Sequence, residues 1–143
     1  MSTKIEPIVW NASLVTGVAI VDEQHQILVN MLNEANEKLT DSTARDVLLE
    51  IVRDLIAYAL YHFDEEEELM VAKGYPADLS AKHSEEHRLF SEKVSHIQQE
   101  LMQGKLIGRD DLLGYLNQWL VNHIMVTDQQ LGRYLTALNS LPD

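Results

Sequence analysis

The chain has 143 residues, a formal net charge of −12 and no cysteine. This length favours one domain with a substantial core, and the missing thiols exclude disulfides, thiolate zinc sites and iron–sulfur clusters. The strong negative charge argues against nucleic acid and against an anionic membrane surface as binding partners.

The N-terminal segment, 1–21, is expected to form an extended arm. It is rich in β-branched residues without a helical period, and its start has no apolar run of the kind found in signal peptides. No stretch of the chain approaches about 20 apolar residues, the length that a membrane span needs. The sequence therefore favours a soluble, cytoplasmic protein. After the arm, Asp22 is the expected N-cap of the first helix.

The first expected helix spans 23–39. Its apolar residues recur at steps of three and four, the period of a core-facing stripe. His25 lies on that stripe, so an imidazole is expected among buried leucines. A buried polar group without a partner is costly, and this position therefore suggests a bound ligand.

The second expected helix spans 43–73 and carries His62 and Glu66 on its apolar stripe. Their spacing of four residues places both side chains on one face. Glu66 lies within an acidic run, 64–68, whose other members are interpreted mainly as a solvated face. Glu65 is the alternative ligand if Glu66 does not face the core.

The third expected helix spans 79–103, after a break that Gly74 introduces as a left-handed cap. His83 and His87 are four residues apart on its apolar stripe, which suits one metal ion. His96 lies off the stripe and is expected at the surface.

The fourth expected helix spans 110–139 and carries His123 and Asp128. Five residues of regular α-helix rotate by about 500°, which would leave these two side chains roughly 140° apart. Two arrangements remain open: the side chains flank the site from two sides, or the helix contains a π-bulge between them.

Four amphipathic helices with short connections predict an all-α, up-down-up-down antiparallel four-helix bundle with an N-terminal arm, a single domain over 1–143. In that topology every candidate ligand falls at the same end of the bundle. Five imidazoles and two carboxylates are too many for one ion and suit two, and a sulfur-free donor set fits Fe, Mn, Zn, Cu or Ni. The candidate metal ligands are His25, His62, Glu66, His83, His87, His123 and Asp128.

Five motifs follow one another along the chain. They are Asp-x-Gln-His (22–25), His-Phe-x-x-Glu (62–66), Tyr-Pro (75–76), His-x-x-x-His-x-x-Phe (83–90) and Trp-Leu-Val-Asn-His-Ile-x-x-x-Asp (119–128). This order closely resembles the hemerythrins, and within them the single-domain bacteriohemerythrins. The resemblance runs from about Trp10 to Tyr134 and fills every expected ligand position.

The resemblance implies a non-haem di-iron centre with an oxo or hydroxo bridge. Three histidines would hold one iron: His83, His87 and His123. Two would hold the other iron and leave it an open position for O2: His25 and His62. The two carboxylates would bridge the irons: Glu66 and Asp128. The oxidised form would take up small anions such as azide.

The resemblance favours a non-enzymatic protein that binds O2 reversibly for storage, delivery or scavenging. The sequence shows no large apolar surface stripe, which favours a monomer. Four apolar residues are candidates to line the O2 pocket: Leu28, Trp119, Leu120 and Ile124. Two alternatives stay open, namely an O2 or redox sensor and a di-iron enzyme that handles peroxide or nitric oxide. No acid or base beyond the ligands stands out in the expected pocket, which weakens the enzymatic alternative.

Overall fold

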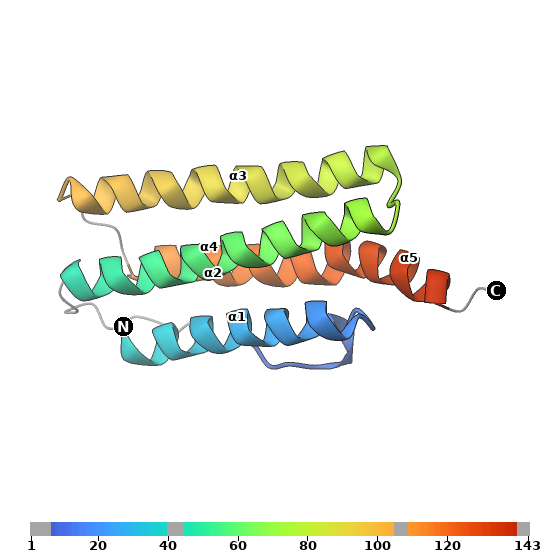
Figure 1. Cartoon of the computed structure of the whole chain (residues 1–143). Coiled ribbons are helices and arrows are strands. Elements are labelled where there is room, and N and C mark those ends of the chain that lie inside the picture. Colours follow the sequence, from blue (N-terminus) through green and yellow to red (C-terminus); the bar gives the residue numbers. More distant parts are fainter. Residues whose placement is uncertain (1–6, 40–44, 105–108, 140–143) are drawn as a thin grey trace.

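The computed structural model describes residues 7–39, 45–104 and 109–139 (Figure 1). The helices are α1 (Ala19–Lys38), α2 (Arg45–Ala72), α3 (Ala77–Met102), α4 (Arg109–Asn122) and α5 (Gln129–Asn139). A π-helical segment, His123–Asp128, joins α4 to α5, and a short 3-10 helix, Ala12–Leu14, lies in the N-terminal arm. No β-strand occurs within these described ranges.

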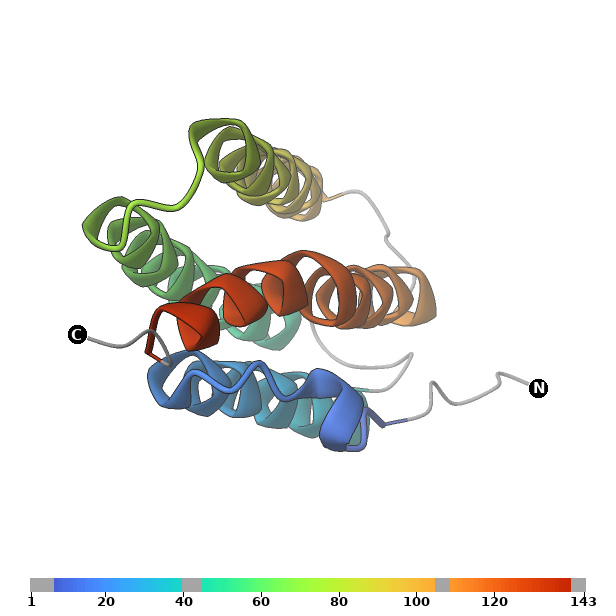
Figure 2. The same ribbon diagram turned by 90° about the vertical axis from the view of Figure 1, so that its right-hand side faces the viewer.

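The helices form an antiparallel bundle in which α1, α2, α3 and the continuous α4–α5 run make four columns (Figure 2). Helix α2 packs against both α1 and α3, and α4 packs against α1. Leu28, Val94 and Leu120 belong to the apolar core between the columns. The predicted all-α four-helix bundle is confirmed. None of the described helices has the length and apolarity needed to cross a bilayer.

The start of the first helix differs from the prediction. Helix α1 begins at Ala19, and Val18, not Asp22, is its N-cap residue. The Asp22 carboxylate instead reaches back from the first turn. It accepts hydrogen bonds from the backbone N–H of Thr16 (2.8 Å) and of Gly17 (3.2 Å). An acidic side chain near a helix N-terminus is favourable in either position, which is why the sequence pattern alone placed the cap too late.

The turn between α2 and α3 follows the prediction. Gly74 has a φ of +67°, and the N–H of Tyr75 donates to the carbonyl of Met70 at 2.9 Å, closing the end of α2. Helix α3 then starts at Ala77, directly after Pro76 and slightly before the expected residue 79. The expected start of the second helix, 43–44, lies outside the described residues.

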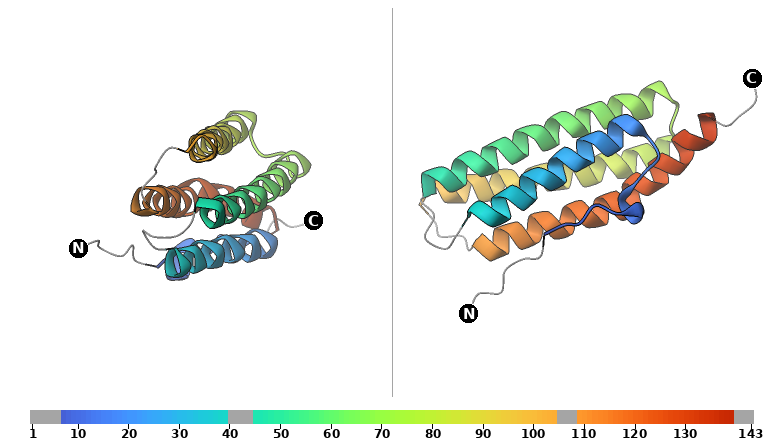
Figure 3. Two further views of the ribbon diagram at one scale, coloured as in Figure 1. Left: turned by 90° about the vertical axis from the view of Figure 1, so that its left-hand side faces the viewer. Right: turned by 90° about the horizontal axis from the view of Figure 1, so that it is seen from below.

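The N-terminal arm runs beside α4 and reaches α5 before it turns into α1 (Figure 3). The Asn33 side chain on α1 exchanges two hydrogen bonds of 2.9 Å with the backbone of Ile8. At its far end the arm approaches α5 so closely that a Cβ on Gly132 would lie 2.5 Å from the carbonyl oxygen of Thr16. The arm is therefore held along the side of the bundle, against α1 at one end and α5 at the other.

Candidate metal centre

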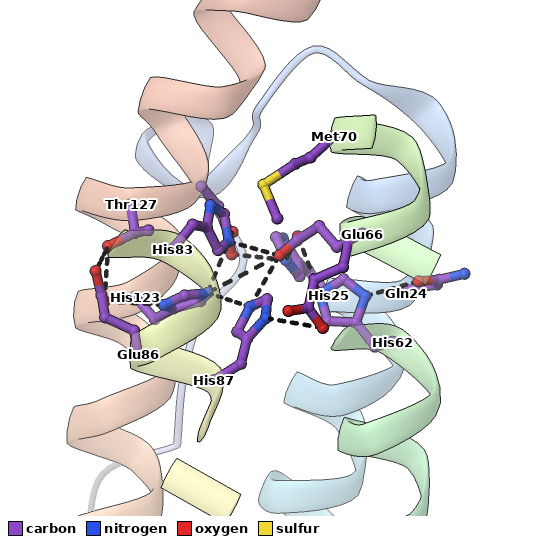
Figure 4. Close-up of polar contacts among 12 residues, drawn as sticks. Gln24, His25, His62, Glu66, Met70, His83, Glu86, His87, His123 and Thr127 are labelled. Atoms are coloured by element: carbon purple, nitrogen blue, oxygen red, sulfur yellow. Dashed lines mark hydrogen bonds and ion pairs between the residues drawn. The ribbon is translucent and has the colours of Figure 1, made fainter. Parts of the chain in front are cut away.

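The bundle brings all seven candidate ligands into one buried cluster (Figure 4). Each of them exposes 3% or less of its surface. They come from every column of the bundle: His25 from α1, His62 and Glu66 from α2, His83 and His87 from α3, and His123 and Asp128 from the π-helical segment. The alternative ligand Glu65 lies outside the cluster, and His96 is exposed on α3, where it pairs with Glu100.

Local helix geometry explains how the side chains converge. On α2 and α3 the paired ligands are four residues apart, so each pair leaves one face. His123 and Asp128 are five apart, and the segment between them is π-helical. A π turn closes between residues five apart, which brings these two side chains to the same face. Of the two arrangements that the sequence left open, the structure contains the bulge.

Glu66 lies between two sets of histidines. Its Oε1 atom is 2.7 Å from Nε2 of His83 and 3.1 Å from Nε2 of His87. Its Oε2 atom is 3.2 Å from Nε2 of His62 and 3.6 Å from Nε2 of His25. One oxygen therefore serves each set, as a carboxylate that bridges two ions would.

Asp128 divides its oxygens in the same way. Its Oδ2 atom is 2.9 Å from Nε2 of His25. Its Oδ1 atom is 3.1 Å from Nε2 of His83 and 3.3 Å from Nε2 of His123. Both carboxylates thus span the gap between the two sets of imidazoles.

Two overlapping donor groups result, and in each the ligand atoms lie within 4.8 Å of one another. The first group contains Glu66, His83, His87 and His123. The second contains His25, His62, Glu66 and Asp128. Because Glu66 belongs to both, the arrangement fits two adjacent ions that share a carboxylate.

The hydrogen-bonding state of the cluster also fits metal binding. Nε2 of His25, Nε2 of His62 and both oxygens of Asp128 are buried and make ion-pair contacts without a well-formed hydrogen bond, His25 with Asp128 and His62 with Glu66. A buried polar atom with no hydrogen bond at all costs about 1–3 kcal/mol, and incomplete hydrogen bonding costs part of that. Cations placed between these atoms would satisfy them, since they are nitrogen and oxygen donors of the kind that hold iron and similar metals.

In the metal-free cluster, the carboxylates and histidines shift one another's pKa values. Burial lowers the pKa of His25 and of His83, but the carboxylates of Asp128 and Glu66 outweigh it and raise the pKa of each histidine to about 9. Burial raises the pKa of Glu66, yet its histidine neighbours, His123 first, hold that pKa well below its ordinary range. In the absence of metal, protons therefore take the place of cations.

A hydrogen bond from behind orients His62. Its Nδ1 atom lies 2.6 Å from Oε1 of Gln24 on α1, and both side chains are buried. Because the amide oxygen can only accept, Nδ1 carries the hydrogen and Nε2 presents its lone pair to the cluster. Such partners fix the tautomer and the direction of a metal-binding histidine.

A charged side chain, Glu86, orients His123 in the same way. The Nδ1 atom of His123 lies 3.1 Å from Oε1 of Glu86, and the Thr127 hydroxyl donates to the same carboxylate at 2.7 and 2.8 Å. Neither Glu86 nor Gln24 was predicted as a site residue, although Gln24 stands in the motif over 22–25. Their adjacency to the ligands His87 and His25 in the chain was the available signal.

Aromatic and aliphatic side chains surround the cluster on the core side. Phe63 stacks on His87 with ring centroids 3.9 Å apart, and Trp119 stacks on His123 at 4.6 Å. Both aromatic residues also line an apolar cavity of about 30 Å³. Three of the predicted pocket residues line this cavity: Leu28, Trp119 and Leu120. The fourth, Ile124, is fully buried in the same core but does not line it.

Comparison with known proteins gives consistent results. The family model of the hemerythrin HHE cation binding domain matches residues 16–135. The chain is 35% identical over 121 residues to a bacteriohemerythrin of Pseudomonas aeruginosa, covering 85% of this chain and 76% of that protein. It is 34% identical over 132 residues to a bacteriohemerythrin of Methylococcus capsulatus, covering 90% and 96% respectively. A crystal structure of wild-type hemerythrin superposes with a TM-score of 0.80 at 31% identity, covering 90% of this chain and 98% of that one.

Proposed function

This chain belongs to the hemerythrin family, and we propose that its buried cluster holds a non-haem di-iron centre that binds O2 reversibly, for storage, delivery or scavenging. The observation that carries the proposal is the pair of donor groups that share Glu66. Bound there, two irons would supply the redox chemistry that reversible O2 binding requires.

The two positions differ in their number of imidazoles. The first donor group offers three histidines and the second offers two, His25 and His62. The second position therefore has room for an external ligand, and we assign O2 to it. Glu66 and Asp128 would bridge both positions, because each turns one oxygen to either set. In the oxidised protein, small anions such as azide would bind at the same open position.

The surrounding residues would keep the site selective. Gln24 and Glu86 hold the lone pairs of His62 and His123 toward the centre. Phe63, Trp119 and Leu120 exclude water on the core side, where the small apolar cavity suits a diatomic gas better than a hydrated ion. A buried, dry site limits access of the protons and water that would favour irreversible oxidation.

The test combines metal analysis with visible spectroscopy. The purified protein is reduced without air, its spectrum is recorded, and air is then admitted and removed. Two irons per chain and a visible spectrum that appears with air and disappears when O2 is removed would support the proposal. Irons that oxidise directly, with no reversible stage, would contradict reversible binding and favour a redox sensor or an enzyme.

A further inference from the structure

A surface cleft of about 230 Å³ between α1 and α2 leads toward the metal cluster. Its α1 wall includes Ile20 and Gln24, and its α2 wall includes Glu65, Glu66 and Glu68. Glu66 is the carboxylate shared by both donor groups and is 1% exposed. The cleft therefore extends from the solvent to a ligand of the buried centre.

The mouth of this cleft is acidic. Glu68 is exposed and Glu65 half-buried, and no lysine, arginine or histidine lines the cleft. Neither Glu65 nor Glu68 forms a salt bridge with another residue in the described ranges, so their charges are not neutralised there. Asp64, Glu67 and Glu68 line an adjoining hollow of about 510 Å³. Together the two hollows present one acidic surface along α2.

The inner wall of the cleft includes Glu66, whose carboxylate belongs to the second donor group. Oε2 of Glu66 is buried and forms no hydrogen bond. It lies 3.2 Å from Nε2 of His62 and 3.6 Å from Nε2 of His25, the two histidines of the second donor group. A cation that reaches Glu66 from the cleft would therefore already be beside its next ligands.

We propose that this cleft is the route by which divalent iron enters the centre, with Glu68 and Glu65 attracting the hydrated cation and Glu66 receiving it. This proposal rests on the proposed function, because it requires that the cluster bind metal. Hydrated Fe2+ is a poor match for the apolar cavity beside Leu120, because a charge taken into an apolar space without partners is strongly disfavoured. Carboxylate oxygens along the cleft replace its water ligands one by one.

The experiment follows uptake of Co2+ by the metal-free protein, because Co2+ gains visible absorption when it is bound by histidines and carboxylates and gives a signal independent of O2 binding. The E65Q/E68Q double variant is compared with the unmodified protein in stopped-flow mixing at several salt concentrations. Electrostatic steering changes association rates by about 10–1,000-fold. We expect uptake by the double variant to slow at least tenfold at low salt and to lose most of its salt dependence, with the same final stoichiometry.

Two further variants separate the route from the overall charge. E34Q/E37Q makes the same change in net charge at the opposite end of α1, where both residues are exposed, and should load like the unmodified protein. A72W places a bulky neutral side chain at the exposed cleft wall and should slow uptake without a change in charge. Unmodified rates in both E65Q/E68Q and A72W, or equal slowing in E34Q/E37Q, would overturn the proposal. Failure of the unmodified protein to bind metal at all would instead refute the proposed function.

Discussion

Gln24 supports a metal ligand without being a ligand itself. Its amide oxygen accepts the Nδ1 hydrogen of His62 at 2.6 Å, and the corresponding support of His123 comes from the charged Glu86 at 3.1 Å. The two donor groups are thus held from behind by different chemistry, a neutral amide for one and a carboxylate for the other. Because a carboxylate increases the basicity of an imidazole more than an amide does, the two metal positions are not equivalent.

Replacing Gln24 with leucine should weaken the centre. The Nδ1 hydrogen of His62 would lose its acceptor in a buried position, which costs about 1–3 kcal/mol of folding free energy. Loss of such a partner lowers metal affinity about 10–100-fold. Competition with a chelator measures the affinity and chemical denaturation measures the stability. Gln26→Leu, at an exposed position on the same helix, is the control, and equal affinities in the two variants would contradict the role of Gln24.

Leu120 is expected to protect the bound O2. It is buried and lines the apolar cavity beside Phe63 and Trp119. Leu120→Asn would place an amide there and admit water, so we expect conversion of the air-exposed protein to its oxidised form to speed up severalfold. Leu120→Met, which roughly keeps volume and polarity, should change that rate little. The rate is read from the visible spectrum over time, and an unchanged rate in the asparagine variant would exclude this role.

At the scale of the helix, the π-helical segment places one residue more between His123 and Asp128 than a pair four apart would have. The added residue lets both ligands face the cluster while Thr127 contacts Glu86. Val126, within the same segment, is 68% exposed, so the extra length is accommodated at the surface.

Shortening and lengthening this segment should therefore affect metal binding differently. Deleting Val126 leaves His123 and Asp128 four residues apart, and a regular α-helix keeps such a pair on one face. Inserting one alanine after Val126 turns Asp128 away by about 100°, the rotation per residue of an α-helix. We expect the deletion variant to keep its metal and the insertion variant to lose much of it, as measured by the metal-to-protein ratio with circular dichroism as a check on folding. Equal losses would contradict this account.

Periodicity predicted the helices and six of the seven clustered residues, whereas Asp128, five residues after His123, lay off the regular stripe. His25, His62 and Glu66 stand on apolar stripes, and antiparallel topology carries those stripes to one end of the bundle. The sequence did not choose between two arrangements for His123 and Asp128, since the π turn depends on where the other columns place the cluster. Likewise, the support by Gln24 depends on how α1 faces α2, which no single helix encodes. The assignment of the seven residues as iron ligands stays a prediction.

The whole metal-free protein should show a distinctive pH dependence. His25 and His83 have pKa values raised from 6.5 to about 9, so their contribution to stability is complete below pH 6.5 and is lost as the pH rises through about 9. Glu66 has a pKa lowered from 4.5, so its contribution is present above pH 4.5 and is lost on acidification. Burial lowers the pKa of His87, so this histidine favours unfolding as the pH falls below 6.5. Stability without metal should therefore be greatest near pH 6.5 and fall on either side.

Metal should reverse the alkaline part of this profile. Cations replace the protons of the cluster, and the histidines must be neutral to bind them. Denaturation of chelator-treated and metal-loaded protein from pH 5 to 9.5 measures both profiles. We expect the free energy of unfolding to fall without metal as the pH rises above about 6.5, and to hold or rise with metal. Parallel profiles would show that the cluster does not exchange protons for cations.

The seven cluster residues come from all four columns of the bundle, and this affects local opening of the fold. If any one helix moves away from the others, at least one side chain leaves the centre with it, because no helix carries a complete set. Bound metal should therefore hold the four columns together, so that the amides of the metal-loaded protein exchange their hydrogens more slowly than those of the metal-free protein.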